Sequence, residues 1–176
     1  PSDHLVRDPA GFDEAVRRAL PCARDGWIVT FGMAPDRPET GYGWIRRGAE
    51  LGDGVHEAER FVEKPGEAAA RAMLEEGGYD WNGGIFLMRA DVVLAGLERH
   101  APTIVDAARR GIERAHDAGL LLTPDRRPFA ESPSVSIDHA LMEKAEKVAV
   151  VPVSLGWSDI GDFAALHAAA ERDEAG

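Results

Sequence analysis

Apolar residues along this chain follow two different periods. Phe12, Ala15 and Ala19 fall on one face of a helix, which the spacing predicts near residues 9–22. Residues 26–33 form instead an unbroken run rich in β-branched and aromatic side chains, which is typical of a buried strand. The sequence therefore predicts an amphipathic helix followed by a strand in the interior of a sheet.

The two patterns alternate along the rest of the chain. Further strands are expected at 43–47, 55–65 and 148–155, and a loop leading into a strand at 81–90. Further helices are expected at 66–78, at 91–119 with an interruption before Pro102, from about 136, and near 161–173. Such alternation favours an α/β domain with a mostly parallel sheet.

Length, charge and cysteine content exclude several classes of function. The 176 residues are predicted to form one domain, and the net charge of −11 disfavours binding to a nucleic-acid polymer or an anionic membrane. The single cysteine, Cys22, excludes an internal disulfide and suits the reducing cytoplasm. Because the chain begins at Pro1 rather than at Met, we expect it to be part of a longer protein.

Polar residues stand in loops that follow predicted strands, where α/β sheets bind their ligands. Asn82 precedes two glycines, so it either forms a turn or uses its amide to bind a ligand hydroxyl. Glu63 and Lys64 end a strand. They form either an exposed edge pair, or a carboxylate for sugar hydroxyls beside an ammonium for a phosphate.

Two aspartates offer the oxygen ligands of a magnesium site. Asp159 lies between a predicted strand and a predicted helix, where either it or Ser158 caps the helix, or Asp159 binds Mg²⁺. Asp3 lies in a similar position, and its structural alternative is a turn or a cap. We expect the two carboxylates to converge on one cavity, because a parallel sheet brings such strand ends together.

Five stretches of sequence follow one another along the chain, namely APDRPETGYGWI, RFVEKP, GGYDWNGGIFLMRA, SPSVSIDHALMEK and VPVSLGWSDIGDFAAL. Together they resemble the mannose-1-phosphate guanylyltransferases, from Pro1 to about Leu166. The resemblance implies a Rossmann-like nucleotidyltransferase domain of three α/β/α layers with a mostly parallel sheet. This chain would be the C-terminal part of that catalytic domain, with residues 1–166 binding the sugar acceptor and residues 167–176 forming a frayed tail.

The resemblance also implies a reaction, in which GTP and mannose 1-phosphate give GDP-mannose and pyrophosphate. The sugar phosphate would attack the α-phosphorus in line, so the protein supplies alignment and charge neutralisation rather than a nucleophile. Asp3 and Asp159 would hold the Mg²⁺ cofactor. The expected setting is polysaccharide biosynthesis in the cytoplasm, with a homo-oligomer as one expected state.

The acceptor site follows from the same resemblance. Glu63 and Asn82 would bind mannose hydroxyls, and Gly43 would approach the sugar through its backbone. Lys64 would meet the sugar phosphate. These four residues are expected to line one cleft with Asp159.

The sequence departs from the family pattern at several places. WNGG stands where WNSG is usual, which removes a serine hydroxyl. The glycine-rich G-x-G-T-R-L loop of the family does not occur in these 176 residues, so the chain alone is expected to be inactive. Two alternatives stay open, a non-catalytic sugar-phosphate-binding module and a nucleotidyltransferase for another hexose 1-phosphate.

Overall fold

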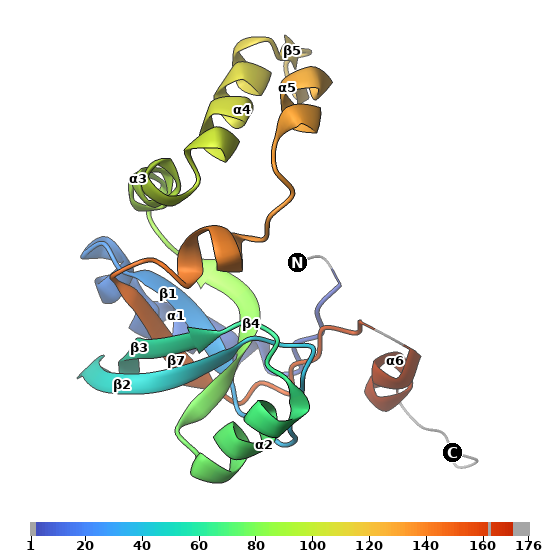
Figure 1. The fold of residues 1–176 in the computed structure, drawn as a ribbon. Coiled ribbons are helices and arrows are strands. Elements are labelled where there is room, and N and C mark those ends of the chain that lie inside the picture. Colours follow the sequence, from blue (N-terminus) through green and yellow to red (C-terminus); the bar gives the residue numbers. More distant parts are fainter. Residues whose placement is uncertain (1–2, 162, 171–176) are drawn as a thin grey trace. The chain divides into compact units, whose positions relative to one another are not determined.

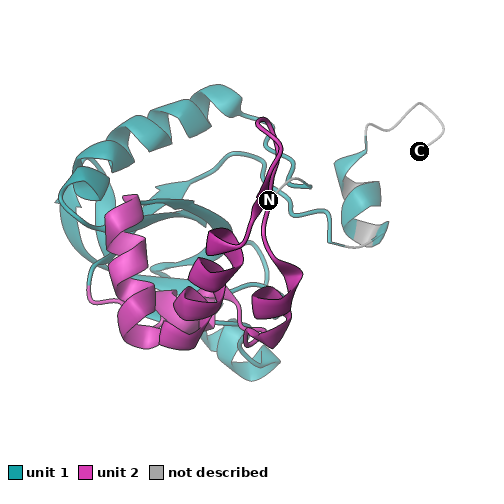
Figure 2. Cartoon of the chain, turned by 90° about the horizontal axis from the view of Figure 1, so that it is seen from above, with its two compact units in different colours: residues 1–88, 147–176 teal, residues 89–146 magenta. Residues whose placement is uncertain are grey.

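The structure is a computed structural model, which describes residues 3–161 and 163–170. The chain divides into two compact units, residues 1–88 with 147–176 and residues 89–146 (Figures 1 and 2). All six candidate site residues belong to the first unit, which is therefore described first.

Five strands of the first unit close into a barrel in the order β1, β4, β2, β3 and β7 (Figure 1). Their bounds are Ile28–Met33 for β1, Trp44–Gly52 for β2, Val55–Val62 for β3, Tyr79–Leu87 for β4 and Val148–Val153 for β7. Within this barrel β1 and β7 run parallel, whereas the other neighbouring pairs are antiparallel. The predicted α/β class is confirmed, but the sheet is mixed rather than mostly parallel, and it closes on itself instead of forming the middle of three layers.

A two-residue turn explains why β2 and β3 are antiparallel. Asp53 and Gly54 connect the two strands with φ angles of 50° and 69°, which is the left-handed backbone that a type I′ turn requires at both central positions. Glycine adopts this conformation without strain, and Asp is one of the few other residues that tolerate it. The strands expected at 43–47 and 55–65 therefore fold back on each other as a hairpin.

The segment WNGG lies inside β4, although a loop is expected there. The register between β1 and β4 shifts beyond Thr30, so the strand bulges at this point. Gly84 has a φ of 66°, and a Cβ at Gly83 would lie 2.6 Å from the Met33 side chain. The two glycines are thus required by a bulge and by a close approach of strands, not by a loop.

The described part of the first unit has three helices, α1 (Pro9–Arg24), α2 (Glu67–Glu76) and α6 (Phe163–Ala169). α1 confirms the helix predicted near residues 9–22, and the Asp8 side chain caps it by accepting a hydrogen bond from Gly11 N at 2.9 Å. Ala15 and Ala19 are fully buried. Small side chains on this face let α1 lie close against β1 and β7.

The start of α6 differs from the prediction that Ser158 or Asp159 caps this helix. Ser158 Oγ accepts a hydrogen bond from Ile160 N, and Asp159 Oδ1 accepts one from Gly161 N, both at 3.2 Å. Each side chain therefore forms a turn by binding the backbone N–H two residues further along the chain. The helix begins only at Phe163.

The chain end that is predicted to fray comprises residues 167–176. Residues 167–169 belong to α6, whereas residues 171–176 lie outside the described residues. The boundary at residue 166 stays a prediction.

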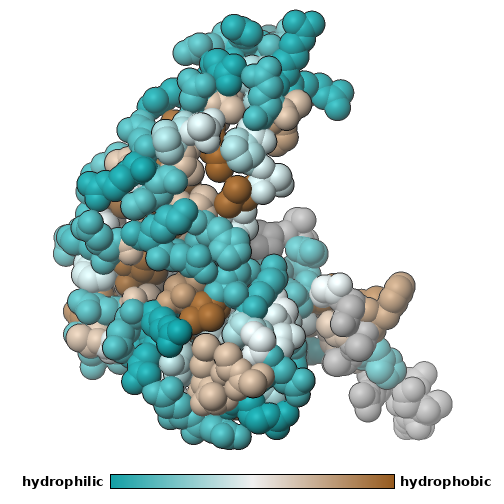
Figure 3. All heavy atoms as spheres, in the orientation of Figure 1, coloured by the Kyte–Doolittle hydropathy of each residue, from teal (hydrophilic) through white to brown (hydrophobic). Residues whose placement is uncertain are grey.

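The second unit is mainly helical. It contains α3 (Ala90–His100), α4 (Pro102–Glu113), β5 (His116–Asp117), β6 (Leu122–Thr123), α5 (Arg126–Glu131) and the π-helix η1 (Asp138–Met142). The helix predicted over 91–119 is interrupted before Pro102 as expected, but it ends at Glu113. The helix predicted from about 136 is the short η1. Hydrophilic residues cover most of the face of the molecule that Figure 3 presents.

Candidate functional site

Three of the candidate acceptor residues meet beside β4, where β2 begins and β3 ends. The registers of β2 with β3 and of β2 with β4 place Gly43 between Glu63 and Asn82. Asn82 N donates a hydrogen bond to Gly43 O at 2.7 Å. A Cβ at Gly43 would lie 2.7 Å from Glu63 Oε2 and 3.2 Å from Asn82 Cβ. The lack of a side chain at Gly43 is therefore what allows a carboxylate and an amide to stand this close together.

Lys64 continues this group toward solvent. Its Nζ lies 3.3 Å from Glu63 Oε1, and 65% of its side chain is exposed, compared with 8% for the Glu63 side chain. Lys64 also has a φ of 45°, a left-handed conformation that is uncommon for residues other than glycine. The pair is thus not an ordinary exposed edge pair, because a nearly buried carboxylate is covered by a cation that remains open to an incoming anion.

The amide of Asn82 is held in a fixed orientation. Asn82 is 9% exposed, and its Oδ1 accepts hydrogen bonds from Thr30 Oγ1 at 3.1 Å and from Gly84 N at 3.2 Å. These contacts engage the carbonyl side of the amide. Asn82 therefore lies in a strand with an anchored side chain and does not form the turn that was one interpretation of the sequence.

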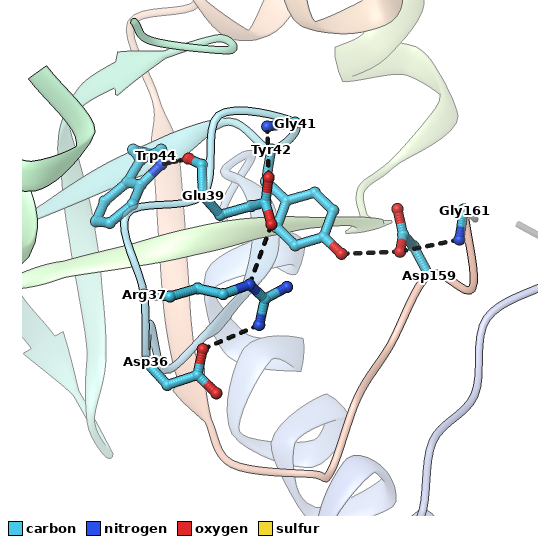
Figure 4. A network of polar contacts seen from close by, with 8 residues as sticks. All are labelled: Asp36, Arg37, Glu39, Gly41, Tyr42, Trp44, Asp159 and Gly161. Atoms are coloured by element: carbon cyan, nitrogen blue, oxygen red, sulfur yellow. Dashed lines mark hydrogen bonds and ion pairs between the residues drawn. The ribbon is translucent and has the colours of Figure 1, made fainter. Parts of the chain in front are cut away.

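Asp159 is oriented by two donors that bind the same carboxylate oxygen. Tyr42 OH donates to Asp159 Oδ1 at 2.8 Å, and Gly161 N donates to the same atom at 3.2 Å (Figure 4). Among the described residues, Asp159 Oδ2 accepts no hydrogen bond. Burial raises the pKa of Tyr42, and the hydrogen bond to the Asp159 carboxylate raises it further. The phenol therefore stays protonated and can donate this hydrogen bond.

The segment that follows Asp3 pairs with the segment that carries Asp159. Leu5 and Ser158 form an antiparallel bridge, in which Leu5 N donates to Ser158 O at 2.8 Å and Ser158 N donates to Leu5 O at 3.1 Å. Burial lowers the pKa of His4, and the nearby carboxylates of Asp3 and Asp159 act in the opposite direction. The bridge therefore joins the segment that follows Asp3 to the segment that carries Asp159.

A cavity of about 740 Å³ opens beside Asp159 within the first unit. Its walls include three aromatic rings, and the centroid of Tyr42 lies 5.4 Å from that of Trp81 and 5.2 Å from that of Trp157. The Trp81 Nε1 atom is buried and has no hydrogen-bond partner among the described residues. A cavity of this volume is in the range of small-molecule sites, with aromatic walls and a few polar groups.

The loop that carries Tyr42 is held by an ion-pair network (Figure 4). Arg37 contacts Asp36 at 3.0 Å and Glu39 at 3.1 Å, and its guanidinium lies 4.9 Å from the centroid of the Trp81 ring. The main-chain oxygen of Glu39 accepts a hydrogen bond from Trp44 Nε1 at 2.8 Å. This loop therefore has a defined conformation, although its proline and glycine content alone suggests only irregular structure.

The candidate residues form two adjoining groups rather than one cleft. The cavity walls include Asp159, but none of Asp3, Gly43, Glu63, Lys64 and Asn82. The Tyr42 ring lines the cavity, whereas a Cβ at Gly43 would face Glu63 and Asn82. Consecutive residues, Tyr42 with Gly43 and Trp81 with Asn82, connect the two groups.

Sequence reasoning did not single out Tyr42, Arg37 or Trp81. A signal for Tyr42 and Trp81 was present, because each directly precedes a candidate acceptor residue in the motifs GYG and DWN. For Trp81, which lies in β4, strand alternation would then have directed the ring to the opposite face from Asn82. Nothing in the sequence pairs Tyr42 with Asp159, which lies 117 positions away.

Two further observations limit the kinds of site. In the part of the chain that the structure describes, no three residues among His, Cys, Asp and Glu are grouped so that they could hold a metal ion. A site made by two carboxylates is not covered by this observation, and Mg²⁺ usually binds through one or two carboxylates plus water and phosphate oxygens. No helix within the described residues is both long and apolar enough to cross a membrane.

Comparison with known sequences identifies relatives of the whole chain. The nucleotidyl transferase family matches residues 1–176. Xanthan biosynthesis protein XanB of Xanthomonas campestris pv. campestris strain B100 is 45% identical over 176 residues, which are 100% of this chain and 37% of that protein. A mannose-1-phosphate guanylyltransferase of Sinorhizobium fredii is 42% identical over 178 residues, covering 100% of this chain and 34% of that protein.

Solved structures with a similar fold agree with these relatives. A protein of Thermus thermophilus described as mannose-1-phosphate geranyltransferase has a TM-score of 0.82 and 36% identity, covering 98% of this chain and 49% of that one. A mannose-6-phosphate isomerase of Helicobacter pylori has a TM-score of 0.81 and 33% identity, covering 90% and 61%. This chain thus spans only part of each relative, and its position within a catalytic domain stays a prediction.

Proposed function

Because this chain belongs to the nucleotidyl transferase family, we propose that the protein containing it forms GDP-mannose and pyrophosphate from GTP and mannose 1-phosphate. The observation that carries the proposal is the group formed by Gly43, Glu63 and Asn82, in which an anchored amide and a nearly buried carboxylate flank a stretch of backbone that has no side chain. Groups of this kind recognise the hydroxyls of a sugar, because they offer donors and acceptors in fixed directions. The names of the two curated relatives support the choice of mannose and of polysaccharide biosynthesis.

In this proposal each acceptor residue has a separate task. Glu63 accepts hydrogen bonds from sugar hydroxyls, Asn82 binds a further hydroxyl, and the backbone of Gly43 lines the sugar ring. Lys64 places its exposed ammonium against the sugar phosphate and offsets part of its charge. The chain thereby orients the phosphate oxygen for in-line attack on the α-phosphorus of the nucleotide, so that most of the catalysis comes from alignment.

We further propose that Asp159 and Asp3 hold Mg²⁺, and the donor set fits this ion. Asp159 Oδ1 is engaged by Tyr42 and Gly161, which leaves its Oδ2 to face a ligand. Asp3 is exposed on a segment joined to the one that carries Asp159. When bound, Mg²⁺ would neutralise charge on the phosphates, while the two carboxylates determine where the ion can lie.

We also expect the reaction to take place in the cytoplasm, where a single free thiol such as Cys22 stays reduced. A homo-oligomer remains part of the prediction and can be tested by light scattering on the purified protein. No membrane and no nucleic-acid polymer enters the proposal.

The test is a pyrophosphate-release assay on the full-length protein with a panel of nucleoside triphosphates and hexose 1-phosphates. We expect GTP with mannose 1-phosphate to give the highest kcat/KM. The variant Glu63→Gln should raise the KM for mannose 1-phosphate at least about tenfold, because charged hydrogen bonds contribute about 1.5–3 kcal/mol, and should leave the KM for GTP unchanged. Preference for another pair of substrates, or an unchanged sugar KM in the variant, would contradict the proposal.

A further inference from the structure

The hydrogen bond between Tyr42 and Asp159 joins residues from distant parts of the first unit. Tyr42 lies in the loop between β1 and β2, and Asp159 follows β7. Figure 4 shows the Tyr42 phenol pointing at the Asp159 carboxylate. The contact is 2.8 Å long, which is the usual length for a hydroxyl that donates to an oxygen.

The ring of Tyr42 cannot easily move away from this position. Trp81 packs on it from one strand and Trp157 from the segment after β7, both with edge-to-face geometry. The ring is thereby held by contacts that do not depend on its hydroxyl group. Asp159 is constrained as well, because Gly161 N binds the same Oδ1 atom and Ile160 has a φ of 48°.

We propose that Tyr42 is the positioning residue of the metal site, acting through Asp159. Its hydroxyl engages Oδ1 and directs Oδ2 toward the ion. Partners of this kind, which bind the ligand rather than the metal, commonly change metal affinity about 10- to 100-fold when they are removed. The inference rests on the proposed function only in taking Asp159 as a ligand of a divalent cation.

The chain contains a matched control for this proposal, because it has two tyrosines. Tyr79 begins β4, and its hydroxyl contacts Arg46 and Glu76 at 3.4 Å. Tyr79 is not among the cavity-lining residues. Tyr79→Phe therefore removes the same atom as Tyr42→Phe, but without a contact to Asp159.

The experiment measures Mn²⁺ binding to the full-length protein by electron paramagnetic resonance, together with steady-state kinetics. We expect Tyr42→Phe to weaken Mn²⁺ binding about 10- to 100-fold, with a KM for mannose 1-phosphate within twofold of the unaltered protein. Tyr79→Phe should leave both quantities unchanged. Replacing Tyr42 by 4-aminophenylalanine, which returns an N–H donor to the same place, should restore most of the affinity.

The controls separate failure of this inference from failure of the metal assignment. If Asp159→Asn leaves Mn²⁺ affinity unchanged, Asp159 is not a ligand and the proposed metal site is wrong. If Asp159→Asn abolishes binding but Tyr42→Phe has the affinity of the unaltered protein, the positioning role of Tyr42 is overturned. A 4-aminophenylalanine variant that melts at the normal temperature but binds Mn²⁺ no better than Tyr42→Phe also overturns it.

Discussion

Replacing Gly43 by alanine tests the acceptor site with the smallest possible change. The added methyl carbon would lie 2.7 Å from Glu63 Oε2, about 0.7 Å closer than the 3.4 Å at which ordinary contact begins. Gly43 does not have a left-handed backbone, so the effect is steric and not conformational. Either the carboxylate or the strand that carries Gly43 must move.

Glu63 has little room to retreat. Its side chain is only 8% exposed and is held by Lys64, while Asn82 and Phe61 would lie within 3.3 Å of the new methyl group on other sides. Overpacking of this kind costs about 1–3 kcal/mol of stability. A displacement approaching 1 Å at a residue that orients a reactant can lower the rate about 100-fold.

We therefore expect Gly43→Ala in the full-length protein to lower kcat/KM for mannose 1-phosphate by about 10- to 100-fold, while the KM for GTP stays within twofold. The assay is pyrophosphate release at varied sugar phosphate, with thermal unfolding as the check on stability. Gly66→Ala is the control, because a Cβ at Gly66 meets nothing within 4 Å and its φ is −66°. Unchanged sugar kinetics in a folded Gly43→Ala protein would refute the argument.

Four further predictions concern ion pairs and the activity of the chain on its own. Lys64→Ala should raise the KM for mannose 1-phosphate far more than the KM for GTP. Lys64→Arg should not restore the KM for mannose 1-phosphate, since a planar guanidinium does not replace a compact ammonium. An equal rise in both KM values would count against the assignment of Lys64. Arg47→Met should lower the free energy of unfolding by about 3–5 kcal/mol in urea, because it leaves the fully buried Asp80 without its bidentate partner. Burial raises the pKa of Asp80 even beside Arg47. The stability that Asp80 contributes is therefore present below its unfolded pKa of about 3.9 and declines as the pH rises through its folded pKa. The free energy of unfolding of the unaltered protein, measured relative to Asp80→Asn, should fall in that pH window, and a rise would contradict the argument. This 176-residue chain alone should release no measurable pyrophosphate, and turnover at the rate of the full-length protein would overturn that expectation.

Elements with a strong local signal could be predicted from the sequence. The apolar period around Ala15 and the Asp8 cap define α1, and the unbroken apolar runs define β1 and β7. The direction of the strands was harder to predict, because it depends on how they are connected and closed. The Asp53–Gly54 dipeptide is a local signal for a hairpin, but closure of the barrel by pairing of β3 with β7 is a long-range event with no local signature.

The acceptor group could be predicted only through resemblance. Composition and spacing leave open whether Asn82 forms a turn or binds a hydroxyl, and whether Glu63 is an edge residue or a sugar ligand, because neither choice changes the apolar pattern. The burial of both side chains depends on what three separate strands bring to Gly43, and no local pattern indicates it. Asp159 shows the same limitation, since its neighbour Tyr42 is distant in sequence and identified only by the folded chain.

The loop before β2 carries residues that contact both groups of the site. Tyr42 binds the carboxylate of Asp159, and the next residue, Gly43, packs between Glu63 and Asn82. Tyr42 and Gly43 thus contact different groups of the site, so one segment can set both the position of the Asp159 carboxylate and that of the proposed sugar site. The Arg37 and Glu39 contacts that hold this loop would then matter for alignment, although neither residue needs to touch the reacting atoms. Alignment of this kind requires that the loop already be ordered before the substrates arrive, because ordering it during the reaction would cost part of the binding energy.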